Sequence, residues 1–86
     1  MKIIETKRYF KAHKKLSKKQ KKQIENTIEI FKENPFNSQL KNHPLKGTMK
    51  NLRAICAANN LRIIYREEDD HIIVIMIDVG SHSQVY

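Results

Sequence analysis

The sequence has few of the residues that would point to several common classes of protein. Its 86 residues include one cysteine, Cys56, and two glycines, Gly47 and Gly80. A single cysteine cannot form a disulfide within the chain, which favours a reducing compartment. Two isolated glycines cannot form a glycine-rich loop around a nucleotide phosphate. No pair of histidines has metal-ligand spacing with cysteine or carboxylate support, so we expect no metal and no small-molecule cofactor.

Long apolar segments are also missing. The sequence has no run of 18 apolar residues, which a transmembrane helix would require, and Met1–Glu5 lacks the long apolar region of a signal peptide. We therefore expect a cytoplasmic protein that does not bind a membrane. A chain of 86 residues is long enough for one domain with a modest core, and we expect residues 1–86 to form that single domain.

Positive charge, in contrast, is abundant and concentrated near the N-terminus. The net charge is +8, and residues 1–22 contain ten Lys and Arg against one acid, Glu5. The other 64 residues contain seven basic and eight acidic side chains. Such a block favours nucleic acid or an acidic partner, because each neutralised phosphate releases counterions. The alternative is a lysine-rich helical hairpin that only keeps the protein soluble. The expected RNA contacts in this block are Lys11, Lys14, Lys15, Lys18, Lys19 and Lys22.

The first part of the chain predicts a short strand and two helices. Residues 2–5 form a strand pattern, and the helical pattern over residues 6–13 follows, with Thr6 as its N-cap. Ser17 can cap a second helix, which ends before Pro35 because the residue preceding a proline avoids the helical region. Apolar residues fall on one face of this second helix: Ile24, Ile28 and Phe31. The two helices make a hairpin with the basic side chains on its outer face.

The rest of the chain predicts strands. Residues 34–50 form a loop or a very short strand. Strand patterns follow over residues 51–57, 61–66, 71–79 and 82–86. The apolar run from Ile72 to Ile77 indicates a central strand that is buried on both faces. We therefore expect the α+β class, with an N-terminal αα-hairpin packed on a mainly antiparallel, four-stranded twisted sheet.

Three side chains near the end of the chain suit RNA chemistry: Arg62, His82 and Tyr86. A guanidinium donates two parallel hydrogen bonds to a phosphate. An imidazole titrates near neutral pH and can move a proton, and a tyrosine can stack on an unpaired base. The four-residue spacing of His82 and Tyr86 places both on one side of a strand. The alternative is that both are ordinary surface residues.

Other polar residues could join this group. A hairpin pairing of the two preceding strands would bring Arg53 to the face of Arg62, unless both arginines pair with the acids at 67–70. His43 and Lys46 flank a loop, where a histidine could move a proton and a lysine could stabilise a developing negative charge. The alternative for this pair is a surface loop with incidental polar residues. Cys56 fits a buried, inert thiol within a strand.

Several separated segments together resemble the RelE/ParE superfamily of bacterial type II toxins, closest to the RelE and YafQ-like mRNA interferases. The resemblance implies a RelE-like microbial RNase fold. The segments that carry it are His43-Pro44-Leu45-Lys46-Gly47, Leu52-Arg53, Leu61-Arg62-Ile63-Ile64-Tyr65 and Gly80-Ser81-His82, followed by Val85-Tyr86.

This resemblance implies a ribosome-dependent endoribonuclease that cuts mRNA in the ribosomal A site without a metal. The ribose 2′-hydroxyl attacks the adjacent phosphate, which leaves a cyclic phosphate. By resemblance, Arg62 holds the scissile phosphate, Tyr86 contacts the substrate, and His82 is the histidine of a Gly-Thr-His segment. His43 is similar to the histidine before Pro-Leu. The basic residues similar to those that line the RelE-type site are Lys46 and Arg53. The resemblance also implies a cognate antitoxin, which we expect to be acidic, and contacts with ribosomal RNA and mRNA.

The chain departs from the family pattern at three positions. Cys56 and Asn60 stand where YafQ-like toxins carry a histidine and an aspartate, and Asp78 stands where some members carry an arginine. The acid and base therefore cannot be copied from the family as a set. His82 is the first candidate for proton transfer, and His43 is the second. A ParE-like toxin that inhibits DNA gyrase without cutting RNA stays an alternative, as does an inactive relative that only binds an antitoxin.

Overall fold

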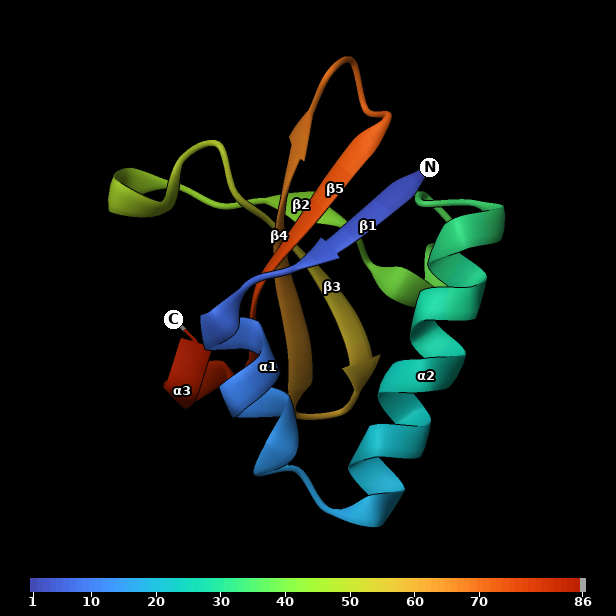
Figure 1. Ribbon diagram of the computed structural model, residues 1–86, viewed down its shortest axis with the longest axis vertical. Helices are drawn as coiled ribbons and strands as arrows, with labels where there is room; N and C mark the ends of the chain where they lie inside the picture. Colours follow the sequence, from blue (N-terminus) through green and yellow to red (C-terminus); the bar gives the residue numbers. More distant parts are fainter. Residues whose placement is uncertain (86) are drawn as a thin grey trace.

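The computed structural model describes residues 1–85, apart from the side chains of His82 and Gln84. One sheet runs through the middle, with two helices on one of its faces (Figure 1). The helices and strands, in chain order, are β1 (Lys2–Glu5), α1 (Lys7–Lys14), α2 (Lys18–Glu33), β2 (His43–Pro44), β3 (Arg53–Ala58), β4 (Leu61–Glu68), β5 (Ile73–Gly80) and α3 (His82–Val85). Two short 3₁₀ helices flank β2: η1 (Ser38–Leu40) and η2 (Gly47–Met49).

The sheet has the strand order β1-β5-β4-β3-β2. β1 pairs with β5 in parallel, and the other three pairs are antiparallel. The α+β class and the mainly antiparallel sheet are confirmed. The sheet has five strands rather than the expected four, because the two-residue β2 adds to the edge beside β3. β5 lies between β1 and β4, so the prediction that this apolar strand is internal is confirmed. Burial on both faces is only partial, because Ile73, Ile75 and Ile77 are half-buried.

The prediction of a terminal strand over residues 82–86 is wrong, because residues 82–85 form helix α3. The Val85 amide donates a helical hydrogen bond to the Ser81 carbonyl at 3.1 Å. β1 pairs with β5 only over residues 73–76, and β4 pairs with it as far as Gly80, so no strand pairing extends beyond Gly80. α3 instead packs Val85 onto the sheet, against Ala54 and Ile64.

Both predicted helix caps are present. The Thr6 side chain accepts from the Tyr9 amide at 3.1 Å and donates to the Met76 carbonyl at 2.8 Å, which fixes the start of α1 against β5. Ser17 and Gln20 form a reciprocal capping box at the start of α2. Each cap satisfies amides that the first helical turn leaves without an intrahelical partner.

The main core lies between the two long helices and the sheet. Phe31 of α2 meets Tyr65 of β4 edge to face, with ring centroids 5.0 Å apart. The predicted apolar face of α2 is confirmed at Ile24 and Phe31, which are both buried, and Ile28 is half-buried. The other buried members of this core are Tyr9, Leu40, Ile55, Leu61, Ile63, Val74, Met76 and Val79.

The opposite side of the sheet, called the open face below, carries a much smaller apolar cluster of Ala54, Ile64 and Val85. β4 alternates between the two sides, so Ile63 and Tyr65 enter the main core while Arg62 and Ile64 point to the open face. The open face is thus only partly covered, by α3 and by the loop residues Leu45 and Leu52.

Candidate functional site

Arg62 occupies the middle of the sheet on the open face. Its Cα partners are Cys56 on β3 and Gly80 on β5. Within residues 1–85, no acidic side chain forms an ion pair with Arg62, whereas Arg66 on the same strand pairs with Glu68 at 2.9 Å. The alternative in which acids of the 67–70 turn pair with Arg62 and Arg53 is therefore wrong within the described residues, where these acids pair with Arg66 and His71 instead. A half-buried guanidinium without a carboxylate is available to bind an anion.

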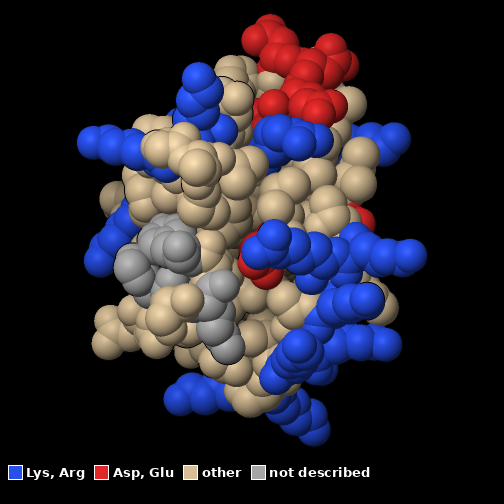
Figure 2. All heavy atoms as spheres, turned by 90° about the vertical axis from the view of Figure 1, so that its left-hand side faces the viewer, with Lys and Arg blue, Asp and Glu red and all other residues tan. Residues whose placement is uncertain are grey.

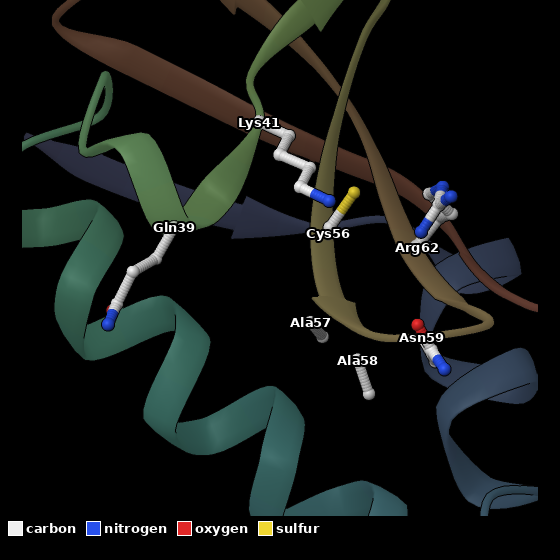
Figure 3. Close-up of a pocket in the computed structure, with 7 residues that line it drawn as sticks. All are labelled: Gln39, Lys41, Cys56, Ala57, Ala58, Asn59 and Arg62. Carbon is white, nitrogen blue, oxygen red and sulfur yellow. The ribbon is translucent and has the colours of Figure 1, made fainter.

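A hollow of about 280 Å³ lies beside Arg62. In Figure 3, the ammonium of Lys41 points toward the Cys56 thiol on the neighbouring strand. The lining residues are Gln39, Lys41, Cys56, Ala57, Ala58, Asn59 and Arg62. Among the described residues, two cations and no carboxylate line this hollow, so it suits a negatively charged group.

The sequence interpretation missed Lys41. It sits between η1 and β2, where its φ of 49° is the left-handed conformation that ends η1. The pairing of His43 with Ala54 carries the chain back toward Cys56, which brings Lys41 to the hollow. The only sequence signal was the two-residue spacing from His43, which is the spacing of side chains on one side of an extended segment.

Cys56 is half-buried and lines the hollow, so the expectation of a fully buried thiol is wrong. β2 has only two residues and pairs with Arg53 and Ala54, so no strand residue lies beside Cys56 on that side. The two other departures from the family pattern lie elsewhere. Asn60 lies in the turn between β3 and β4. Asp78 is buried, where it accepts from Arg8 Nε at 3.1 Å and from the Val79 amide at 2.9 Å.

His43 also lies on the open face, because its Cα partner is Ala54. Its Nδ1 is 2.8 Å from the Lys41 carbonyl oxygen. A carbonyl only accepts, so Nδ1 donates this hydrogen bond and carries a proton. His43 lies two strands away from β4, opposite Ile64, and Arg62 is two residues further along β4. With ordinary strand spacings, the two Cα atoms are about 12 Å apart. His43 therefore borders the Arg62 hollow without lining it.

Arg53 lies on the other side of the sheet, so the expectation that it shares the face of Arg62 is wrong. The register pairs Arg53 with Tyr65, whose side chain is in the main core. Arg53 donates to Asn42 Oδ1 at 2.8 Å and lies over the Phe36 ring at 5.4 Å. Through these contacts Arg53 holds the segment before β2 in position.

Asn42 holds the same segment in position through two further hydrogen bonds. Its side-chain amide donates to the Tyr65 hydroxyl at 2.7 Å and to the Pro35 carbonyl at 2.9 Å. Burial raises the pKa of Tyr65, so the phenol stays protonated at neutral pH. Asn42 lies between Lys41 and His43 in sequence, so its anchoring holds both residues in place.

Lys46 is exposed and is the N-cap residue that precedes η2, beyond the point where β2 ends. β2 runs antiparallel to β3, so the chain after His43 passes Arg53 and then Leu52, away from Cys56. The hydrogen bond from the Leu45 amide to the Leu52 carbonyl, at 2.9 Å, shows this direction. The structure therefore does not bring the Lys46 backbone to the hollow beside Arg62.

The remaining predicted site residues are at the C-terminal end. His82 begins α3, two residues after Gly80, and Gly80 is the Cα partner of Arg62. The backbone of His82 thus lies within about 8 Å of Gly80, given the 3.8 Å spacing of consecutive Cα atoms. The side chain of His82 and all of Tyr86 lie outside the described residues, so their predicted roles stay predictions.

The predicted basic surface is present on α1 and the start of α2. All six of its lysines are exposed: Lys11, Lys14, Lys15, Lys18, Lys19 and Lys22. Figure 2 shows Lys and Arg side chains gathered at the lower right, whereas acidic residues cluster at the top, at the turn after β4. Only one of the six has an acid nearby in the described part of the chain, since Lys22 is 4.0 Å from Glu25.

Neither a metal cluster nor a membrane-spanning helix is found in the part of the chain that the structure describes. No three His, Cys, Asp or Glu side chains there are grouped as metal ligands would be. None of the helices there combines the length and hydropathy needed to cross a bilayer.

Comparisons with known proteins give a family match and several similar folds. A family model described as a bacterial toxin of the type II toxin-antitoxin system, YafQ, matches residues 1–86. The crystal structure of YafQ from E. coli is similar at a TM-score of 0.82 and 18% identity, covering 98% of this chain and 96% of that one. A YoeB/ParE toxin from Agrobacterium tumefaciens is similar at a TM-score of 0.79 and 22% identity, covering 95% and 99%.

A third similar structure is the E. coli DinJ-YafQ toxin-antitoxin complex, with a TM-score of 0.80 and 20% identity over 98% of this chain and 94% of that chain. At such identities the structural likeness shows the fold alone. A search of curated proteins found no match.

Proposed function

Because the chain belongs to the YafQ family of bacterial type II toxins, we propose that it is an endoribonuclease that cuts mRNA in the ribosomal A site. The observation that carries this proposal is the basic hollow on the open face. Arg62 lines it without an acidic partner in the described part of the chain, and the face is only partly covered. A phosphodiester is the anion that such a site in this family would meet.

The proposed reaction is an attack of the ribose 2′-hydroxyl on the adjacent phosphorus. A base takes the 2′-hydroxyl proton, and an acid gives a proton to the leaving 5′-oxygen, which yields a 2′,3′-cyclic phosphate and a 5′-hydroxyl. The nucleophile belongs to the substrate, so the reaction needs no metal-bound water. Arg62 would donate to the non-bridging oxygens and stabilise the charge that develops on them.

Proton transfer is assigned to the histidines at the border of this site. His82 is the first candidate, because α3 begins two residues after the Cα partner of Arg62. His43 is the second, and the contact of its Nδ1 with the Lys41 carbonyl orients the ring. Tyr86 would contact the substrate base. Lys46 would provide further positive charge near the RNA, away from the hollow itself. Arg53 lies on the other side of the sheet and is not assigned an RNA contact.

The basic surface on α1 and α2 supports a contact with ribosomal RNA. Exposed lysines with few acidic neighbours release counterions when they meet phosphates. The cytoplasm, where ribosomes translate mRNA, is the compartment in which residues 1–86 would act as one toxin domain. By analogy with the DinJ-YafQ complex, the proposed partner is an acidic antitoxin with a segment that folds on binding over this surface.

The test is cleavage of a defined mRNA by purified protein, with and without ribosomes, read out by primer extension. We expect cuts at codon positions only when ribosomes are present. Arg62→Ala should abolish the cuts, and Arg66→Ala, which removes an ion-paired arginine from the same strand, should retain them. Intact transcripts together with inhibition of DNA gyrase would instead support a ParE-like toxin. Cleavage that is equal without ribosomes would overturn the ribosome-dependent mechanism.

A further inference from the structure

Two cations flank one thiol in the hollow. Cys56 on β3 is the Cα partner of Arg62 on β4, and Lys41 comes from the segment before β2 on the other side of β3. The Lys41 ammonium points toward the Cys56 thiol (Figure 3). Three separate segments therefore converge on the hollow, and two of them contribute a positive charge.

The charges of Lys41 and Arg62 are not balanced locally. In the described residues, neither side chain forms an ion pair, whereas Arg8 pairs with Asp78 at 3.0 Å and Arg66 pairs with Glu68. Two like charges beside one hollow repel each other, and an anion placed between them would turn that repulsion into attraction. The hollow of about 280 Å³ far exceeds the roughly 15 Å³ that one water needs.

The backbone of Lys41 is held in place by the fold. Its carbonyl accepts from His43 Nδ1 at 2.8 Å, and its amide donates to the Ser38 carbonyl at 3.4 Å. The next residue, Asn42, is bonded to the buried Tyr65. Lys41 is therefore on an anchored segment, and that segment also carries His43, a candidate for proton transfer.

We propose that Lys41 is a second phosphate-binding residue, which with Arg62 holds a single RNA phosphodiester in the hollow above Cys56. This assignment rests on the proposed function and adds a residue to it. The Arg62 fork takes two non-bridging oxygens, and the Lys41 ammonium contributes a point charge from the opposite side. Cys56, small and uncharged as a thiol, leaves the space that a larger side chain would fill.

Binding of a non-cleavable ligand tests this directly. The probe is a mixed-sequence 2′-O-methyl hexaribonucleotide, in which the blocked 2′-oxygen prevents cutting. Lys41→Gln removes the charge and keeps a side chain of similar length. We expect it to weaken binding about tenfold, as the loss of a charged hydrogen bond does. The slope of log affinity against log salt should fall by about 0.7, the value for one single-strand phosphate contact.

Matched variants separate this role from a general loss of charge. Lys50→Gln removes an exposed lysine that does not line the hollow, and it should weaken binding less than about twofold, as a rim charge does. Lys41→Arg should restore binding. Far-UV circular dichroism and thermal unfolding of each variant confirm that the fold is intact.

Cys56 gives a second readout, because it is the only cysteine of the chain. The rate at which iodoacetamide alkylates it, followed by mass spectrometry, reports whether the hollow is occupied. The hexaribonucleotide should slow alkylation of the wild-type protein and of Lys50→Gln, and at the same ligand concentration it should protect Lys41→Gln and Arg62→Ala less. Each variant is compared with itself without ligand, which removes any direct effect of the charge on thiol reactivity.

The outcomes separate this inference from the proposed function. If Lys41→Gln binds and protects Cys56 as the wild type does, or loses no more affinity than Lys50→Gln, the role of Lys41 is overturned. If the wild type neither binds the probe nor protects Cys56, the hollow is not a phosphate site. If binding and protection follow Lys41 but no mRNA is cut on ribosomes, the inference stands and the proposed reaction fails.

Discussion

The two sides of the sheet differ in what they contribute to the protein. The helix-covered side buries large side chains such as Phe31 and Tyr65, both about 1% exposed or less. The open face has a small apolar cluster around Ile64, and beside it Arg62 and Lys41 line a hollow. Strand β4 contributes to both sides, because successive side chains point in opposite directions. The residues that stabilise the fold and those proposed to bind an anion therefore lie on opposite sides of the sheet, and changes on one side should leave the other largely intact.

The largest expected effect is on the helix-covered side. Phe31→Ala removes a buried ring that packs against Tyr65 and should lower the free energy of unfolding by about 3–5 kcal/mol. This approaches the whole stability of many small domains, so activity would be lost with the fold. Phe31→Leu should cost less than about 2 kcal/mol and keep activity. Denaturant titration with a far-UV readout measures both, and a cost below 1 kcal/mol for Phe31→Ala would contradict the core described above.

Arg62→Ala should reduce activity strongly and leave stability almost unchanged. We expect mRNA cleavage on ribosomes to fall about 100- to 1,000-fold, the usual cost of removing one group that stabilises transition-state charge. The free energy of unfolding should change by less than about 0.5 kcal/mol, as for other partly exposed residues without a partner. Arg66→Ala is the matched control on the same strand. Cleavage rates and denaturant midpoints measured on the same preparations decide the outcome, and a large loss of stability would break the separation between the two faces.

Alkaline pH should weaken the helix-covered side selectively. Burial, with a smaller contribution from Glu5, raises the pKa of Tyr9 to about 12, from an ordinary value of 10.0. The folded state therefore keeps the phenol proton where the unfolded state loses it. This contribution to stability is complete below pH 10 and is lost as the pH rises toward 12, at about 1.4 kcal/mol per pH unit. Unfolding followed from pH 9 to 11 should show a shallower decline in Tyr9→Phe than in the wild type, and parallel curves would be inconsistent with this assignment.

The lysines of α1 and α2 should make the affinity for ribosomes depend on salt concentration. Replacing Lys15, Lys18 and Lys19 together by Gln should lower the slope of log ribosome affinity against log salt by about 2, since each phosphate contact contributes about 0.7–0.9. Lys32→Gln removes a lysine that is 3.7 Å from Glu29 near the other end of α2, and it should change the slope little. Sedimentation with ribosomes over a range of salt concentrations provides the measurement. An unchanged slope in the triple variant would show that this surface does not meet ribosomal RNA.

The smallest effects distinguish the two buried tyrosines. The Tyr9 hydroxyl is buried without a hydrogen-bond partner in the described part of the chain, so Tyr9→Phe should raise the free energy of unfolding by about 1 kcal/mol at pH 7. The Tyr65 hydroxyl accepts from Asn42 at 2.7 Å, so Tyr65→Phe should lower it by about 1 kcal/mol. Thermal unfolding of the two variants side by side is sufficient, and shifts of the same sign would refute the difference between the two sites.

Tyr65→Phe also tests the link between the two faces. Asn42 joins Tyr65 to the segment that carries Lys41 and His43. Loss of that anchor should therefore reduce binding of the hexaribonucleotide more than Tyr9→Phe does. Equal binding by both variants would show that the segment keeps its position without the Tyr65 hydrogen bond.

Local features of this protein were predictable from the sequence because they depend on neighbours a few residues apart. Thr6 and Ser17 cap their helices through amides three residues away, and the apolar spacing of α2 identifies its buried face. The alternation along β4 likewise places Arg62 away from the core before any strand pairing is known. Charge is equally local, which is why the exposed basic surface was predictable from composition.

Only the tertiary structure decided the features that depend on pairing between distant segments. The register of β3 against β4 puts Arg53 on the helix-covered side, although both arginines lie on adjacent strands. The chain after Gly80 forms α3, which packs Val85 against Ala54 and Ile64 rather than pairing as a strand. Lys41 and Arg62 are 21 positions apart in the sequence. The short pairing of β2 with β3 brings Lys41 to the hollow beside Arg62. Hydrogen bonds within a turn are encoded by adjacent residues, whereas strand register is set by the packing of the whole chain.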